Sequence, residues 1–181
     1  ATIFTLADAR LLNYYFEQKN PEGFTPEQQR AVAGFRMHAS IANLSRGAAR
    51  LDPLLEENAV LEEQGGEISI EAFKQQLYSV ENPSGIRATV YDHTANVYGR
   101  LEGSKIALRP LDNTGVQYGL AALNAGIISP RQFIDLNRDI GGFDRDLNHV
   151  DSRHRADPLA TKRAVETGRI LHGGAGLAVT P

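Results

Sequence analysis

Residues 109–126, RPLDNTGVQYGLAALNAG, join a run of polar turn residues directly to a short helix. Pro110 fixes one backbone dihedral, and Asp112 or Asn113 can cap the first turn of the helix that follows. Gly126 stands where a residue in the left-handed conformation would close that helix. The stretch therefore predicts a capped turn at the start of a helix, with a polar site as the alternative.

Capping residues and apolar periodicity predict further helices on both sides of this stretch. The clearest cover about residues 6–19, a segment that begins at Thr25-Pro26, residues 129–140 and residues 157–167. Shorter helical turns are expected over residues 47–57, and another helix is expected from Ser69 to Val80. Most of the chain is thus predicted to be helical.

The best candidate strand runs from Ile86 to Tyr91, because β-branched residues and alternation coincide there. The loop at residues 102–105 lies between two possible short strands and suggests a hairpin. We therefore expect a mainly α fold, an irregular helical domain with one short β-hairpin or strand pair, as a single domain over residues 1–181. Within it, residues 62–67 are expected to be an exposed connector and residues 172–181 a linker.

Composition gives no reason to expect a nucleic acid or a membrane as a partner. The chain has 181 residues, a net charge of -3 and no cysteine. A weakly acidic chain has no general attraction for phosphate backbones or acidic lipids. No apolar run approaches the roughly 18 residues that a membrane-spanning helix needs. Disulfides and thiolate nucleophiles are excluded by the absence of cysteine.

The sequence contains no Gly-x-Ser-x-Gly nucleophile elbow, so the strongest acid/base candidate is the pair Asp92-His93. A histidine beside a carboxylate can be oriented and tuned for proton transfer. Neighbouring residues on a strand point to opposite faces, however, so these two side chains are not expected to bond to each other. His93 remains open between a catalytic base and a polar loop residue.

The only cofactor that the residues suggest is calcium. Asp144, Asp146 and Asn148 alternate as in the first half of a calcium-binding loop. The second half does not fit, because His149 stands at the turn position that needs glycine and Arg155 at the position that needs glutamate. A surface turn is therefore favoured over a metal site.

Four segments together resemble a known family. They are residues 92–99 (DHTANVYG), 109–119 (RPLDNTGVQYG), 132–137 (QFIDLN) and 140–142 (IGG). In these segments the chain is similar to a family of large, exported bacterial proteins that is catalogued as a domain of unknown function and has an α/β-hydrolase-like core.

This resemblance implies that the catalytic serine lies outside the chain. Members of the family are several times longer, have their nucleophile elbow upstream of the similar segment and continue into a core strand after it. The start at Ala1-Thr2 and the glycine-rich end at residues 173–176 are consistent with a chain that is cut at both ends. The chain is then expected to be the helical insertion, or lid, of an extracellular or periplasmic serine-type hydrolase that acts on ester or related acyl bonds.

The expected partners are the remainder of the hydrolase polypeptide and a small-molecule or polymeric ester. No residue of the chain is expected to be catalytic by itself. The residues expected to face the substrate or to brace the core are Asp92, His93, Asn96, Tyr98, Arg109, Asp112, Asn113, Gln117 and Tyr118. The alternative is a non-catalytic binding module with a calcium-binding turn.

Overall fold

The computed structural model describes residues 2–53 and 75–169. In these residues the fold is mainly helical and includes a two-stranded antiparallel sheet, as predicted. No helix among them is long and apolar enough to cross a membrane. The connector expected at 62–67 and the linker expected at 172–181 lie outside the described residues. So does the first half of the helix expected over 69–80, while its second half forms turns instead of a helix.

The chain divides into two compact units. The first unit consists of residues 1–48 and 111–155, and the second of residues 49–110 and 156–181. Each unit is therefore built from two separate segments of the chain.

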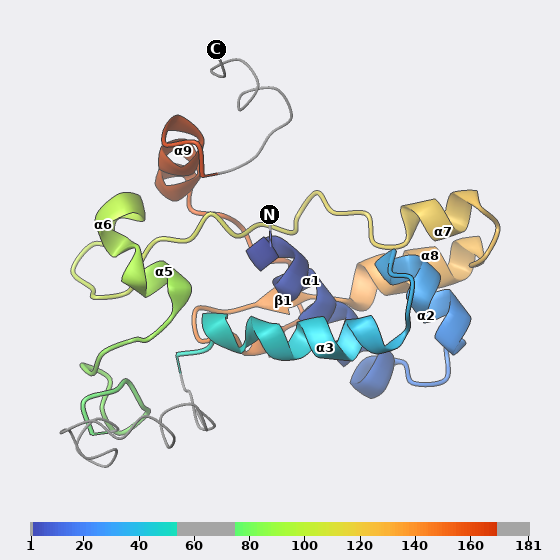
Figure 1. The fold of residues 1–181 in the computed structure, drawn as a ribbon, viewed down its shortest axis with the longest axis horizontal. Helices are drawn as coiled ribbons and strands as arrows, with labels where there is room; N and C mark the ends of the chain where they lie inside the picture. Colours follow the sequence, from blue (N-terminus) through green and yellow to red (C-terminus); the bar gives the residue numbers. More distant parts are fainter. Residues whose placement is uncertain (1, 54–74, 170–181) are drawn as a thin grey trace. The chain divides into compact units, whose positions relative to one another are not determined.

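The first unit is organised around helix α1 (Thr2–Tyr14), which continues into the π-helical turn η1 (Tyr15–Lys19). Helix α3 (Ala39–Gly47) lies along α1 (Figure 1). The two helices approach closely at Gly47, where an added Cβ would lie 2.9 Å from a methyl carbon of Leu6. A small residue at this point permits the packing of the two helices.

Three helices form a second cluster in the same unit (Figure 1). They are α2 (Pro26–Ala33), α7 (Leu120–Asn124) and α8 (Pro130–Asp139). Thr25 and Gln28 form a capping box at the start of α2, and Ser129 and Gln132 form one at the start of α8, which confirms both predicted starts. The two boxes also touch, because Gln132 Nε2 donates to Gln28 Oε1 at 3.2 Å.

A short hairpin completes the first unit. Strand β1 (Gly142–Phe143) pairs antiparallel with β2 (His149–Val150). Gly141 enters the hairpin with φ of 66°, and an added Cβ there would lie 2.1 Å from the carbonyl oxygen of Val150. The ring of His149 stacks on the ring of Tyr14 with centroids 3.7 Å apart. The hairpin is thereby fastened to the end of α1.

The polar stretch before α7 is held by Asn113, whose exposed fraction is 0%. Asn113 Nδ2 donates to the carbonyl oxygen of Gly141 at 3.0 Å, and its Oδ1 accepts from the backbone N–H of His154 at 2.9 Å. The Asn113 N–H also donates to the His154 carbonyl at 3.1 Å. One buried side chain thus joins the stretch to both sides of the hairpin.

The prediction that Asp112 or Asn113 caps the helix is wrong. Helix α7 begins only at Leu120, and its N-cap is Gly119 in the left-handed conformation. Asp112 Oδ1 instead accepts from the N–H of Thr114 at 2.7 Å, which makes a local turn. The predicted end of the helix is confirmed, since Gly126 has φ of 68°.

Tyr118 extends this buried network toward α1. Its hydroxyl donates to Asp8 Oδ1 at 2.6 Å, and its backbone exchanges two hydrogen bonds with the side chain of Asn137. The guanidinium of Arg153 lies over the Tyr118 ring, 5.0 Å from its centroid. Burial raises the pKa of the Asp8 carboxyl, and burial together with the neighbouring Asp8 raises the pKa of the Tyr118 hydroxyl.

The described residues of the second unit form three helices and the 3₁₀ turn η2 (Ala48–Leu51), which begins on the last residue of the first unit. The helices are α5 (Val90–His93), α6 (Ala95–Tyr98) and α9 (Pro158–Glu166), with α9 beside α6 (Figure 1). Arg163 of α9 donates from Nη1 to the carbonyl oxygen of Tyr98 at 2.8 Å. Gly99 leaves room for this guanidinium, because an added Cβ would lie 2.4 Å from Nη1.

The strand predicted from Ile86 to Tyr91 is wrong. Ile86 forms only an isolated parallel bridge with Leu77, and the chain enters α5 at Val90. The cause is Thr89, whose Oγ1 accepts from the backbone N–H of Asp92 and caps the helix. The hairpin predicted around residues 102–105 is present as a single antiparallel bridge between Arg100 and Ala107.

We expect the substitution Asn113→Ala to lower the free energy of unfolding by about 2–4 kcal/mol, because it leaves a buried carbonyl and a buried N–H without their partners. Urea unfolding followed by circular dichroism measures this loss. The control is Asn124→Ala, at an exposed position of α7, with an expected change within about 0.5 kcal/mol. Equal changes in the two variants would show that the buried amide is not a stabilising contact.

We expect His149 to make the stability of the first unit depend on pH. Burial, with the nearby charges of Arg10 and Lys19, lowers the pKa of His149 from 6.5 to about 4. Between these two pH values the unfolded state binds more protons at this histidine than the folded state does. The contribution of His149 to the free energy of unfolding is therefore complete above about pH 6.5 and is lost as the pH falls toward about 4.

The substitution His149→Phe keeps an aromatic ring beside Tyr14 and removes the titrating group. Urea midpoints measured at several pH values between these limits should fall less for this variant than for the native chain. A profile that is the same in His149→Phe and the native chain would contradict the assignment.

Candidate functional site

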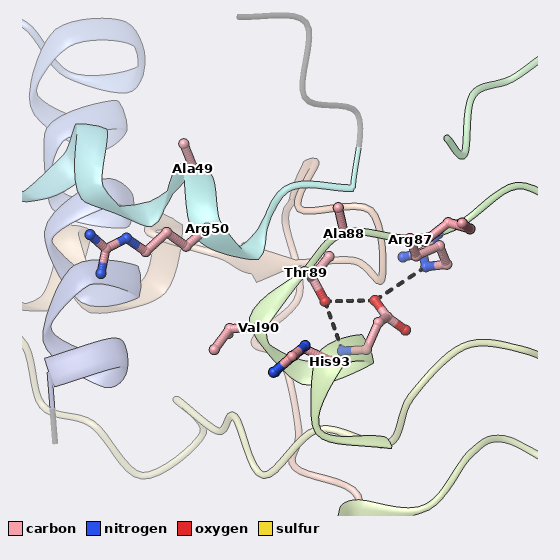
Figure 2. A pocket seen from close by; sticks show the side chains of 9 residues that line it. Ala49, Arg50, Arg87, Ala88, Thr89, Val90 and His93 are labelled. Carbon is pink, nitrogen blue, oxygen red and sulfur yellow. Dashed lines mark hydrogen bonds and ion pairs between the residues drawn. The ribbon is translucent and has the colours of Figure 1, made fainter. Parts of the chain in front are cut away.

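The second unit contains a cavity of about 600 Å³, lined by residues 49–50, 86–90 and 92–93 (Figure 2). Its volume lies within the range of small-molecule sites, roughly 300–1,000 Å³. The apolar lining consists of short side chains, Ala49, Ile86, Ala88 and Val90. The polar and charged lining consists of Arg50, Arg87, Thr89, Asp92 and His93.

The start of α5 positions the polar wall of this cavity. Thr89 adopts an extended backbone before the helix, and its hydroxyl donates to Asp92 Oδ2 at 2.6 Å (Figure 2). Asp92 Oδ1 accepts from the backbone N–H of Ala107 at 2.9 Å. The Asp92 carboxylate therefore joins the helix to the bridge between Arg100 and Ala107.

Arg87 lies on the other side of this carboxylate. Its Nε is 3.6 Å from Asp92 Oδ2, and the side chains of the two residues are only 5% and 9% exposed. The guanidinium also lies over the ring of Tyr78, 4.4 Å from its centroid. A buried arginine held by a carboxylate and an aromatic face balances the charge of Asp92.

His93 is the next residue along α5 and is exposed. In Figure 2 its ring lies on the same side of α5 as Val90. The carboxylate of Asp92 interacts with Thr89 and Arg87. Asp92 is thus a structural acceptor in this arrangement and does not orient the His93 ring. What His93 presents to the cavity is an accessible imidazole.

The residues expected to face the substrate divide between the two units. Asp92, His93, Asn96, Tyr98 and Arg109 belong to the second unit, and Asp112, Asn113, Gln117 and Tyr118 belong to the first. Of the nine, Asp92 and His93 line the cavity.

The other residues of this set in the second unit have separate positions. Asn96 is exposed on α6, and Tyr98 contacts the ring of Tyr91 edge-on with centroids 6.1 Å apart. The backbone N–H of Arg109 donates to Asp157 Oδ2 at 2.7 Å, and its carbonyl accepts from the Asp157 N–H. Tyr98 and Arg109 therefore have contacts typical of bracing residues.

In the first unit, Asn113 and Tyr118 are buried in the network described above, while Asp112 and Gln117 are exposed. Asn113 and Tyr118 thus brace the packing of that unit.

Sequence reasoning missed Arg87 and Thr89 as parts of the site. The spacing of Thr89 and Asp92 is that of a capping box, a threonine followed three residues later by an acid, and this pattern could have indicated a helix start here. The position of Arg87 beside Asp92 depends on the fold around it, since a charge pair has no fixed spacing in the chain.

The turn predicted as a weak calcium site is closed by its own side chains. Asp144 Oδ1 accepts from the backbone N–H groups of Asp146 and Asn148 at 2.8 and 2.9 Å, and Oδ2 accepts from Asn148 Nδ2 at 3.0 Å. These bonds shape the turn between β1 and β2. Among residues 2–53 and 75–169, no group of three or more histidine or acidic side chains could hold a metal ion.

A protein family described as a tannase-like family of unknown function (DUF6351) matches residues 1–181 of the chain. No curated protein and no solved structure matches the chain. The family match agrees with the hydrolase-type resemblance of the sequence, and it assigns no role to individual residues.

We expect Asp92→Ala to lower the free energy of unfolding by about 3–5 kcal/mol, because the buried guanidinium of Arg87 loses its carboxylate. Thermal and urea unfolding measure this effect. His93→Ala, one residue further along at an exposed position, is expected to change the free energy of unfolding by no more than about 0.5 kcal/mol. A large loss with His93→Ala and none with Asp92→Ala would reverse the roles assigned to the two residues.

Proposed function

The chain belongs to this tannase-like family, and we propose that it forms the substrate-covering part, or lid, of a serine-type hydrolase that acts on ester or related acyl bonds. In this proposal the chain binds and encloses the substrate and supplies no nucleophile. The hydrolase is exported and acts in the extracellular or periplasmic space, as the resemblance of the sequence implies. Its partners are the catalytic remainder of the same polypeptide and an ester substrate.

The observation that carries the proposal is the cavity of about 600 Å³ beside α5. Short apolar side chains leave room for an organic group, and Arg50 and His93 add polar contacts at the lining. Mostly apolar walls with a few polar groups are typical of sites that bind and orient a small molecule. The cavity supports substrate binding within the second unit.

The contacts of the residues that line this cavity favour a role in covering the substrate over a role in catalysis. The sequence contains no nucleophile elbow, and the carboxylate of Asp92 is engaged by Thr89, Arg87 and the N–H of Ala107. A carboxylate that orients a catalytic histidine must hydrogen-bond to that histidine. A segment that closes over a substrate can still raise the rate by excluding water and by fixing the orientation of the scissile bond.

We expect the purified chain to hydrolyse 4-nitrophenyl butyrate no faster than buffer does, because it provides no activated nucleophile. Release of 4-nitrophenolate, followed by absorbance, measures the rate. The matched variant is His93→Ala, which should give the same background rate. Turnover by the native chain that disappears in His93→Ala would contradict the lid assignment and make His93 a catalytic base.

Substrate covering has its own test in the natural protein, whose intact mass shows whether the chain is longer and whose sequencing shows whether it carries a nucleophile elbow. We expect Val90→Trp, which fills the cavity, to lower kcat/KM roughly tenfold, the equivalent of about 1.4 kcal/mol of lost transition-state stabilisation. Val165→Trp, at an exposed position of α9 in the same unit, is the control. Equal kinetics for Val90→Trp and the native protein would show that substrate does not enter this cavity.

A further inference from the structure

A second cavity, of about 390 Å³, lies in the same unit and shares Ile86, Arg87 and Asp92 with the first. Its remaining lining comes from Ser84, Gly85, Arg100 and Lys105. Three cationic side chains and one carboxylate therefore surround one small space. The excess of positive charge is larger than at the first cavity, where Arg50 and Arg87 are the lysine or arginine side chains beside Asp92.

Arg100 and Lys105 belong to the hairpin around residues 102–105, Arg87 precedes α5, and each of the three cations is held in position. Lys105 Nζ donates to the carbonyl oxygen of Ser84 at 3.0 Å, and Arg100 Nη1 donates to the carbonyl oxygen of Lys105. Arg87 is fixed between Asp92 and the ring of Tyr78. Lysine has three donors and arginine five, so the lysine and Arg100 retain donors beyond those used on the backbone.

The single carboxylate of the cavity is already bound on both of its oxygens. Asp92 Oδ2 accepts from Thr89 and lies beside Arg87, and Oδ1 accepts from Ala107. Its charge offsets one of the three cations, which leaves an excess of two positive charges at the cavity lining. Guanidinium and ammonium groups bind oxyanions through short, charge-assisted hydrogen bonds.

We infer that this cavity is a binding site for a small dianion with carboxylate or phosphate oxygens, held by Arg100, Lys105 and the buried Arg87. Gly85 on one wall packs closely against the backbone of Leu77, because an added Cβ there would lie 2.3 Å from the carbonyl oxygen of Leu77. The backbone is thus tightly packed behind the cavity, and the ligand meets preformed walls. This site does not depend on the lid assignment, because its binding is measured without any ester.

Isothermal titration of the whole chain with inorganic phosphate and, separately, with succinate tests the inference. We expect at least one of the two to bind, with a dissociation constant that rises roughly tenfold in Arg100→Gln and in Lys105→Gln, because each variant removes one charge-assisted contact. Tighter binding of phosphate would assign a phosphoryl group to the site, and tighter binding of succinate a dicarboxylate. Acetate should bind more weakly than either.

The control is Lys162→Gln, which removes an exposed cation from α9 in the same unit. It should leave the dissociation constant unchanged, and the melting temperatures of all three variants should confirm that they fold. Absence of binding by both dianions would overturn the inference. An equal rise of the dissociation constant in Lys162→Gln would also overturn it, because it would show a general attraction of anions to positive charge. Acetate binding as tight as that of the dianions would overturn it too.

Discussion

The buried amide of Asn113 is the contact on which the first unit depends. A side chain with no exposure must find partners for its donors and its acceptor, because an unpaired amide in a core is costly. Asn113 meets this requirement with Gly141 on one side and His154 on the other. The polar stretch and the two sides of the hairpin are therefore held together by hydrogen bonds of fixed direction, in a position where apolar packing alone would specify no orientation.

The second unit has an equivalent centre in Asp92. Its carboxylate connects the N-cap of α5, the bridge at Ala107 and the buried Arg87. A charge pair of this kind is specific because removal of either partner leaves a buried charge behind. The two cavities of the unit lie against this pair and share its residues. The shape and the charge of both cavities therefore depend on the same ion pair.

The contacts of Asn113 and Asp92 show how structural polar residues differ from candidate functional residues in this chain. Asn113, Tyr118 and Asp92 are polar residues that could belong to an active site, yet each one is engaged in bonds that hold the backbone. His93, Arg100 and Lys105 are exposed polar groups that line the cavities. The chain belongs to a tannase-like family and has a cavity of small-molecule size, from which we propose a role in covering an ester, and the basic cavity is the basis for the anion site that we infer.

The sequence by itself determined the helix starts at Thr25 and Ser129, the helix ends at Gly126 and Gly141, and the mainly α fold. These features depend on contacts within a few residues, so spacing along the chain is sufficient to predict them. Only the tertiary structure decided that Asn113 is a buried connector and that Arg87 pairs with Asp92. The reason is physical: burial and the identity of a distant partner set the energy of a polar group, and neither can be read from its neighbours in the chain.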